Sequence, residues 1–126
     1  MDFFMKDDIK VIYVEDEPSI ARLLSSGLGL FGITVNPIFM SAEELLADVE
    51  GEDFNSADIL MFDIRLPRMT GVDLASELRK RGDKRPFVLV SAWPSPSKET
   101  LQEIQAQFLP KPYDFPDVVQ TIQKLV

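Results

Sequence analysis

Four apolar runs in this sequence each end at polar residues that could take part in a reaction. If the runs are neighbouring parallel strands, their carboxyl ends share one edge of a sheet, where open α/β sheets place their binding sites. Three carboxylates, a hydroxyl and an amine would then meet in one crevice. The residues at the four endings are Glu15, Asp16 and Glu17, then Asp63, Ser91 and Lys111.

Carboxylates as close as these would need a partner. Two of them about 4 Å apart repel by roughly 4 kcal/mol at an effective dielectric constant near 20, and a cation, a shared proton or an amine relieves the repulsion. Lys111 can be the amine. The sequence has no cysteine and no histidine, so its metal ligands would be oxygen atoms, which suit a hard cation such as Mg²⁺. Taken alone, the acidic run Glu15-Asp16-Glu17 fits a solvated loop before a helix as well as it fits a binding site. The additional carboxylate of Asp63 favours the binding site.

An ionised aspartate in such a crevice can act as a nucleophile toward phosphorus and form an aspartyl phosphate. Phosphoryl transfer depends chiefly on positioning and on neutralising the charge of the three phosphoryl oxygens. Mg²⁺, the Lys111 ammonium and the Ser91 hydroxyl could supply that neutralisation from three sides. Taken singly, Ser91 and Lys111 are ordinary strand-end and surface residues, but together with the carboxylates they favour a phosphorylation site.

Composition predicts one soluble domain over residues 1–126. Apolar residues make up 45% of the chain and charged residues 27%, which is ordinary for a globular protein. A net charge of -8 would repel nucleic acid, so we expect no direct nucleic-acid binding. Without cysteine or histidine, the chain has no disulfide, no Cys nucleophile, no Ser-His-Asp triad and no phosphohistidine.

The elements that would position the crevice are five β-type runs alternating with five helical patterns, the signature of a parallel sheet covered by helices. Pro37 in the second run predicts an edge strand, and the polar stretch 50–56 is expected to be a loop. The strands are expected at about 9–14, 33–39, 58–62, 87–91 and 107–109.

The five helices have recognisable beginnings or apolar faces. Pro18 begins the first, which Gly32 ends, and Ser41 with Glu44 forms a capping-box pattern for a second helix that reaches Val49. Ser95 or Ser97 could cap the fourth and Asp114 the fifth. The apolar faces of the third and fourth helices consist of Val72, Ala75 and Leu78, and of Leu101, Ile104 and Phe108.

Neither secretion nor membrane insertion is expected. The amino end, residues 1–8, has no basic region followed by a long apolar core, as a signal peptide would. The longest apolar stretch, around residues 23–35, is interrupted by polar residues and glycines and is too short to cross a bilayer. We therefore expect a cytoplasmic protein.

At this point the sequence resembles the CheY-like receiver domain of two-component response regulators, over essentially its whole length. The resemblance implies a flavodoxin-like, doubly wound, five-stranded parallel sheet of order 2-1-3-4-5 with five helices. The matching motifs are Val14-Glu15-Asp16-Glu17, Asp63 with Leu66-Pro67 and Gly71, Ser91-Ala92, and Leu109-Pro110-Lys111-Pro112.

The resemblance also implies roles for these residues. Asp63 would be the phosphoacceptor, and Asp63 and Asp16 would bind Mg²⁺ directly, while Glu15 would act mainly through water. The backbone carbonyl of Arg65 would complete the protein's share of the metal ligands. Ser91 and Lys111 would bind the phosphoryl oxygens, and the peptide bond between Lys111 and Pro112 is expected to be cis.

The family's switch implies a pathway for the signal. Phosphorylation would draw Ser91 toward the phosphate and let Phe108 move inward, which would remodel the face formed by helix 4, strand 5 and helix 5; alternatively, Phe108 is a fixed core residue. The donor would be a histidine kinase or histidine phosphotransfer protein acting in trans. The downstream effector, a separate protein or a fused domain, is not indicated. The chain would not be an enzyme, although it would assist its own phosphorylation and dephosphorylation.

The loop after Ser91 departs from the family pattern. Trp93, Pro94 and Pro96 occupy a loop where most relatives begin a longer helix. Trp93 and Arg65 flank the phosphorylation site, where their bulk and charge could set the lifetime of the phosphate. Trp93 could equally be a partner contact or a cover for the core.

Three other functions compete with a receiver. A receiver-like scaffold that no longer accepts phosphate is disfavoured by the intact set of site residues. An aspartate-nucleophile phosphohydrolase usually carries a second Asp two residues after the nucleophile, where this sequence has Arg65. A flavin-binding electron carrier shares the fold, but Glu15, Asp16 and Glu17 would repel its phosphate.

Overall fold

The computed structural model describes residues 8–126, which form one sheet covered by helices. The strands are all parallel and lie in the order β2-β1-β3-β4-β5, which confirms the doubly wound, flavodoxin-like sheet predicted from the sequence. The strands are β1 (Ile9–Val14), β2 (Ile33–Phe39), β3 (Ile59–Asp63), β4 (Phe87–Ser91) and β5 (Ala106–Pro110).

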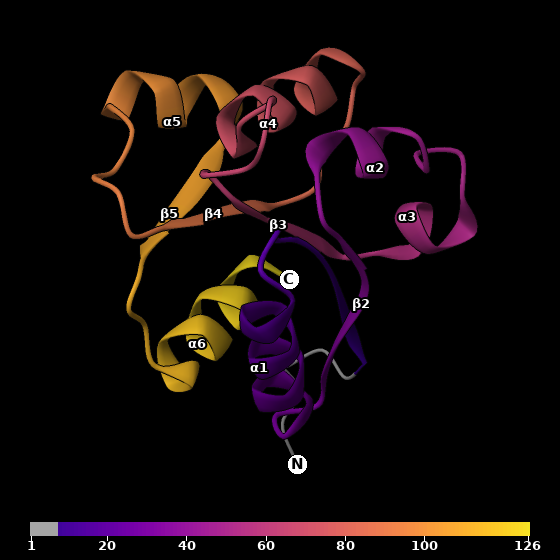
Figure 1. Cartoon of the computed structure of the whole chain (residues 1–126), viewed down its shortest axis with the longest axis vertical. Coiled ribbons are helices and arrows are strands. Elements are labelled where there is room, and N and C mark those ends of the chain that lie inside the picture. The colour runs from indigo at the N-terminus through magenta and orange to yellow at the C-terminus, as the bar shows by residue number, and fades with distance from the viewer. Residues whose placement is uncertain (1–7) are drawn as a thin grey trace.

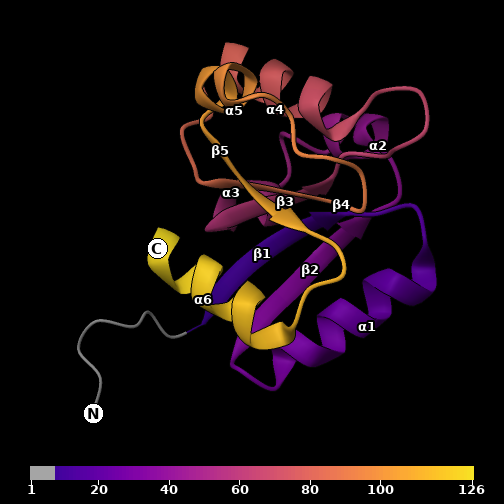
Figure 2. The same cartoon turned by 90° about the vertical axis from the view of Figure 1, so that its left-hand side faces the viewer.

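Helices cover both faces of the sheet. In Figure 1, α1 and α6 lie on one side of the sheet and α2, α3, α4 and α5 on the opposite side, while Figure 2 shows the strands running between these two layers. Within residues 8–126 the helices are α1 (Pro18–Gly29), α2 (Ala42–Leu46), α3 (Glu52–Ser56), α4 (Gly71–Lys80), α5 (Lys98–Ile104) and α6 (Phe115–Leu125).

Each face of the sheet has its own apolar core. Successive side chains of a strand point to opposite faces, so Val11 and Tyr13 of β1 pack toward α1 and α6, whereas Ile12 and Val14 pack toward the helices of the other layer. All residues of β3 and β4 are buried, which explains why both strands appear in the sequence as nearly continuous apolar runs. Among the strands of the described residues, β2 pairs only with β1, which confirms the edge position predicted from Pro37.

One stretch expected to be a loop is helical, so residues 8–126 contain six helices rather than the five predicted. Residues 50–56 contain α3, whose Phe54 is buried in the core. The Arg85 guanidinium donates hydrogen bonds to the carbonyl oxygens of Phe54 and Ala57 and lies 4.5 Å from the centre of the Phe54 ring. This contact comes from a residue about 30 positions away, and the local polar pattern therefore did not indicate it.

Several boundaries also differ from the sequence prediction. β3 runs from Ile59 and includes Asp63, and β5 is longer at both ends than residues 107–109. The second helix ends at Leu46 rather than Val49. Phe108 lies on β5, as its position within the predicted fifth strand implies, and does not continue the helical pattern of Leu101 and Ile104, because Gln105 adopts a left-handed conformation (φ 52°) that ends α5.

The helix caps explain how three of these helices, α2, α4 and α5, begin. The Ser41 hydroxyl accepts a hydrogen bond from the backbone N–H of Glu44 as predicted, but the Glu44 carboxylate accepts from Met40 and not from Ser41. A complete capping box, which the sequence analysis did not identify, joins Thr70 and Asp73 at the start of α4. Ser97 caps α5.

No helix within the described part of the chain is long and apolar enough to cross a membrane. The prediction that the amino end is not a signal peptide concerns residues that, apart from the last, lie outside the described range.

Candidate functional site

The carboxyl ends of four strands meet at one edge of the sheet, as predicted. Glu15 directly follows β1, Asp63 and Ser91 are the last residues of β3 and β4, and Lys111 directly follows β5. These residues line a cavity of about 340 Å³. Its other lining residues are Asp16, Glu17, Ile20, Arg65 and Ala92.

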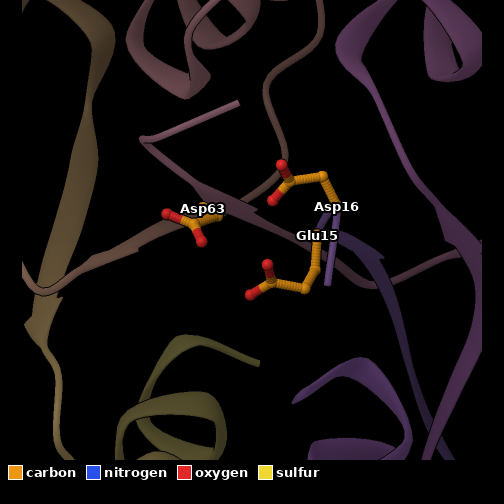
Figure 3. Close-up of side chains that lie close together, drawn as sticks. All are labelled: Glu15, Asp16 and Asp63. Carbon is orange, nitrogen blue, oxygen red and sulfur yellow. The ribbon is translucent and has the colours of Figure 1, made fainter. Parts of the chain in front are cut away.

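Three carboxylates form an acidic cluster at this edge. Glu15, Asp16 and Asp63 each offer a carboxylate oxygen, and these oxygens lie within 4.8 Å of one another. Figure 3 shows the three side chains reaching into the same space from the neighbouring strands β1 and β3. A group of carboxylate oxygens at such separations fits a hard divalent cation such as Mg²⁺.

Lys111 joins the two buried members of the cluster. Its ammonium nitrogen lies 3.0 Å from Asp63 Oδ2 and 3.0 Å from Glu15 Oε1, and its side chain is only 18% exposed. The backbone N–H of Lys111 donates to the carbonyl oxygen of Ser91, which ties the loop after β5 to the end of β4. The bond between Lys111 and Pro112 is cis, as the resemblance predicts.

The pKa values of Glu15 and Lys111 reflect both their burial and their contact with each other and with Asp63. Burial raises the pKa of the Glu15 carboxyl, and the nearby Asp63 adds to this effect, while the hydrogen bond from Lys111 opposes it. Burial by itself lowers the pKa of Lys111, but hydrogen bonds to Asp63 and Glu15 outweigh burial, and the net pKa is raised. Lys111 therefore stays cationic at neutral pH and partly neutralises the acidic cluster.

Backbone groups orient the remaining site side chains. The second Asp63 oxygen, Oδ1, accepts a hydrogen bond from the backbone N–H of Arg65 at 3.0 Å, and Ser91 Oγ accepts one from the backbone N–H of Trp93 at 3.0 Å. Asp63 and Ser91 are both buried. Gly71 begins α4 directly against Asp63, since a Cβ at this position would overlap the Asp63 carbonyl oxygen.

Arg65 and Trp93 lie together at the rim of the cavity. The Arg65 guanidinium carbon is 4.7 Å from the centre of the Trp93 ring, and Trp93 is 49% exposed. The sequence placed each residue beside the site, but their contact with each other is a finding of the structure.

Sequence reasoning missed one residue next to the site. Tyr13 is fully buried in β1, and its hydroxyl donates a 2.9 Å hydrogen bond to Glu15 Oε1. The signal available in the sequence was a tyrosine in the apolar run Val11–Val14, because a buried tyrosine usually finds a hydrogen-bond partner.

A larger hollow elsewhere does not compete with this site. It measures about 420 Å³ and lies near the amino end of β4. Two of its charged residues, Asp83 and Arg85, pair with each other at 2.7 Å, and within residues 8–126 the only grouping of metal-ligating side chains is the one at Glu15, Asp16 and Asp63.

The fold and the strand-end site together define the receiver class of α/β proteins. The response regulator receiver domain family matches residues 11–123, and the chain belongs to this family. The receiver domain is a signalling domain of two-component systems.

Individual relatives agree with this assignment. The DNA-binding transcriptional regulator NtrC of Salmonella typhimurium is 27% identical over 90% of this chain and 24% of its own length. The uncharacterized transcriptional regulatory protein YkoG of Bacillus subtilis is 30% identical over 90% of this chain and 49% of its own length. The chain thus spans between about a quarter and a half of these relatives.

Solved structures share the fold. The response regulator TrrA from Thermotoga maritima, determined in complex with Mg²⁺-BeF, matches with a TM-score of 0.81 and 24% identity, covering 94% of this chain and 99% of that one.

Proposed function

We propose that this chain, as one receiver domain over residues 1–126, accepts a phosphoryl group on Asp63 in a two-component phosphorelay. The observation that carries the proposal is the environment of the Asp63 carboxylate. One of its oxygens faces the Lys111 ammonium, and the side chain lies in the same cavity as Glu15, Asp16 and Ser91. An aspartate in such a position is a competent nucleophile toward phosphorus.

The donor would be a phosphohistidine on a histidine kinase or histidine phosphotransfer protein. These 126 residues contain no histidine, so the phosphohistidine must lie outside them. A carboxylate oxygen of Asp63 forms a bond to phosphorus as the bond between phosphorus and the donor imidazole nitrogen breaks, and the imidazole leaves with the electron pair. The Lys111 ammonium and the Ser91 hydroxyl then donate hydrogen bonds to two phosphoryl oxygens.

Mg²⁺ would bind at the acidic cluster. The carboxylates of Glu15, Asp16 and Asp63 fit the ion by type and spacing, with the backbone carbonyl of Arg65 as a further oxygen ligand. The bound ion would neutralise negative charge on the transferred group. The Mg²⁺-BeF complex of the TrrA relative supports this choice of metal.

The signal would leave through the face that receiver domains form from helix 4, strand 5 and helix 5, which here corresponds to α5, β5 and α6. Phe108 on β5 is partly buried and packs against the core that lies beneath α4 and α5. Its strand neighbour Leu89 lies two residues before Ser91. A movement of Ser91 toward a phosphate would therefore reach Phe108 through β4, and partner binding to this face would change. Amide chemical shifts on α5, β5 and α6 that stay the same after phosphorylation would refute this switch.

The phosphoacceptor is tested directly by mass measurement. The native chain and Asp63→Asn are each incubated with Mg²⁺ and a small acyl phosphate, and their intact masses are recorded. We expect one phosphoryl adduct on the native chain and none on Asp63→Asn. A native chain that gains no adduct, either from this donor or from a histidine kinase, would overturn the proposal.

A further inference from the structure

Tyr13 is the one residue of β1 that carries a polar side-chain atom into the core beneath α1 and α6. Its ring is completely buried among the apolar residues of that layer, whereas its hydroxyl reaches the carboxyl end of the strand. A buried hydroxyl is unfavourable unless it is hydrogen-bonded. The Tyr13 hydroxyl meets this need by donating to Glu15 Oε1 at 2.9 Å.

The Glu15 carboxylate is held from three directions. Oε1 accepts from Tyr13 and from Lys111, the latter at 3.0 Å, and Oε2 accepts from the backbone N–H of Glu17 at 3.2 Å. A glutamate has several side-chain torsions that must be fixed before its carboxylate has a defined direction. Of the two side chains that donate to Glu15, Tyr13 is completely buried in the strand that directly precedes Glu15, whereas Lys111 is 18% exposed.

Tyr113 supports Tyr13 in turn. Tyr113 packs against the same apolar core that contains Tyr13. Tyr113 and Lys111 belong to the same loop after β5, so this loop contacts Glu15 directly through Lys111 and packs against the core around Tyr13 through Tyr113.

We propose that Tyr13 is a positioning residue, which holds the Glu15 carboxylate in the orientation that Mg²⁺ binding requires, with Tyr113 as a second support. The inference rests on the proposed function, since it assumes that the acidic cluster binds Mg²⁺. Hydrogen-bond partners of metal ligands orient the ligand, and their removal typically lowers metal affinity about 10- to 100-fold.

The test is a Mg²⁺ titration of the native chain, Tyr13→Phe, Tyr113→Phe, Glu15→Gln and the double variant of Tyr13→Phe with Glu15→Gln. Binding is followed by the fluorescence of Trp93, the single tryptophan of the sequence, and independently by the amide chemical shift of Asp16. We expect Tyr13→Phe to weaken binding about tenfold and Tyr113→Phe to weaken it less. In the Glu15→Gln background, Tyr13→Phe should cause no further loss, because its effect passes through Glu15.

Unfolding in urea without Mg²⁺ separates positioning from general destabilisation. Glu15 keeps its bonds to Lys111 and Glu17 in Tyr13→Phe, so this variant should remain folded. If Tyr13→Phe does not fold, Tyr113→Phe, which changes a partly exposed side chain, tests the support of Glu15 through Tyr13 instead.

Two results would overturn the positioning role of Tyr13. The first is equal Mg²⁺ affinity of the native chain and Tyr13→Phe. The second is that Tyr13→Phe weakens Mg²⁺ binding as much in the Glu15→Gln background as it does in the native chain. A native chain that binds no Mg²⁺ and gains no phosphoryl group would refute the proposed function itself.

Discussion

The Lys111 ammonium binds the proposed phosphoacceptor and Glu15 at the same distance, 3.0 Å. A phosphoryl group on Asp63 would introduce new oxygens for Lys111 to contact, so this residue would exchange partners when the site is modified. The contact of Lys111 with Asp63 and Glu15 would then be the arrangement of the unphosphorylated site, and phosphorylation would add negative charge for the same ammonium to bind.

Arg65 and Trp93 allow a prediction about the lifetime of the phosphate. Their contact beside the cavity would hinder the approach of water to a phosphorylated Asp63, and a cation-π pair is worth about 0.5–1 kcal/mol at an exposed position. We expect Trp93→Ala to shorten the lifetime of the aspartyl phosphate about two- to fivefold, the factor that this energy corresponds to. The lifetime is measured as the loss of the phosphoryl adduct with time.

Trp93→Phe is the matched control, because it keeps an aromatic ring over Arg65 and should have a smaller effect. An unchanged or longer lifetime in Trp93→Ala would show that the pair does not limit access of water.

Asp83 and Arg85 allow a prediction about pH. Burial raises the pKa of the Asp83 carboxyl, but hydrogen bonds from Arg85 outweigh this, and the net pKa is lowered. The contribution of the ionised Asp83 to the stability of the fold is therefore fully present above the pKa of Asp in the unfolded chain, about 3.9. This contribution is lost as the pH falls through the lower pKa that Asp83 has in the folded state.

We expect Asp83→Asn to lower the free energy of unfolding at neutral pH by about 1.5–3 kcal/mol, the usual value of a hydrogen bond to a charged group. Urea unfolding at several pH values should show that this difference shrinks below about pH 4. Glu50→Gln, which removes a charge from an exposed position, controls for net charge. A difference that did not change with pH would contradict the ionic origin of the effect.

At the scale of elements, α1 and α6 pack closely because of a glycine. A Cβ on Gly27 of α1 would overlap the Phe115 ring of α6, whereas a Cβ on Gly29 would meet no atom within 4 Å. Gly27 thus allows α1 and α6 to lie close to each other.

We expect Gly27→Ala to destabilise the protein by about 1–3 kcal/mol, because the Phe115 ring must be displaced. Gly29→Ala in the same helix should instead stabilise it by up to about 1 kcal/mol, since alanine has the higher helix propensity. Urea unfolding of both variants measures the contrast. Equal effects of the two substitutions would contradict the role of the contact with Phe115.

At the scale of the whole molecule, the acidic balance makes the fold sensitive to cations. The chain carries a net charge of -8, and part of its negative charge is concentrated at the acidic cluster. A ligand that binds only the folded state stabilises it by mass action.

We expect Mg²⁺ at about ten times its dissociation constant to raise the free energy of unfolding by about 1.4 kcal/mol. Thermal unfolding is compared in MgCl₂ and in NaCl of the same ionic strength, so that general screening cancels. Asp16→Asn should lose most of the difference. An equal gain in both salts would show that screening alone acts on the native chain.

The sequence by itself determined the sheet and most of the candidate site. Parallel strands place their carboxyl ends at one edge, so the endings at Asp16, Asp63, Ser91 and Lys111 were enough to bring these residues into one cavity. The apolar runs of β3 and β4 are unbroken up to Asp63 and Ser91, and β1 is interrupted only by Lys10, so their positions could be recognised without any knowledge of contacts.

Only the tertiary structure decided which distant groups meet. α3 is stabilised by Arg85 from far along the chain, and its own residues look like a polar loop. The hydrogen bond from Tyr13 to Glu15 and the contact between Arg65 and Trp93 depend on side-chain directions that periodicity does not encode. The physical reason is that helix and strand patterns report burial along one element, whereas capping, pairing and carboxylate orientation depend on partners that folding brings from elsewhere.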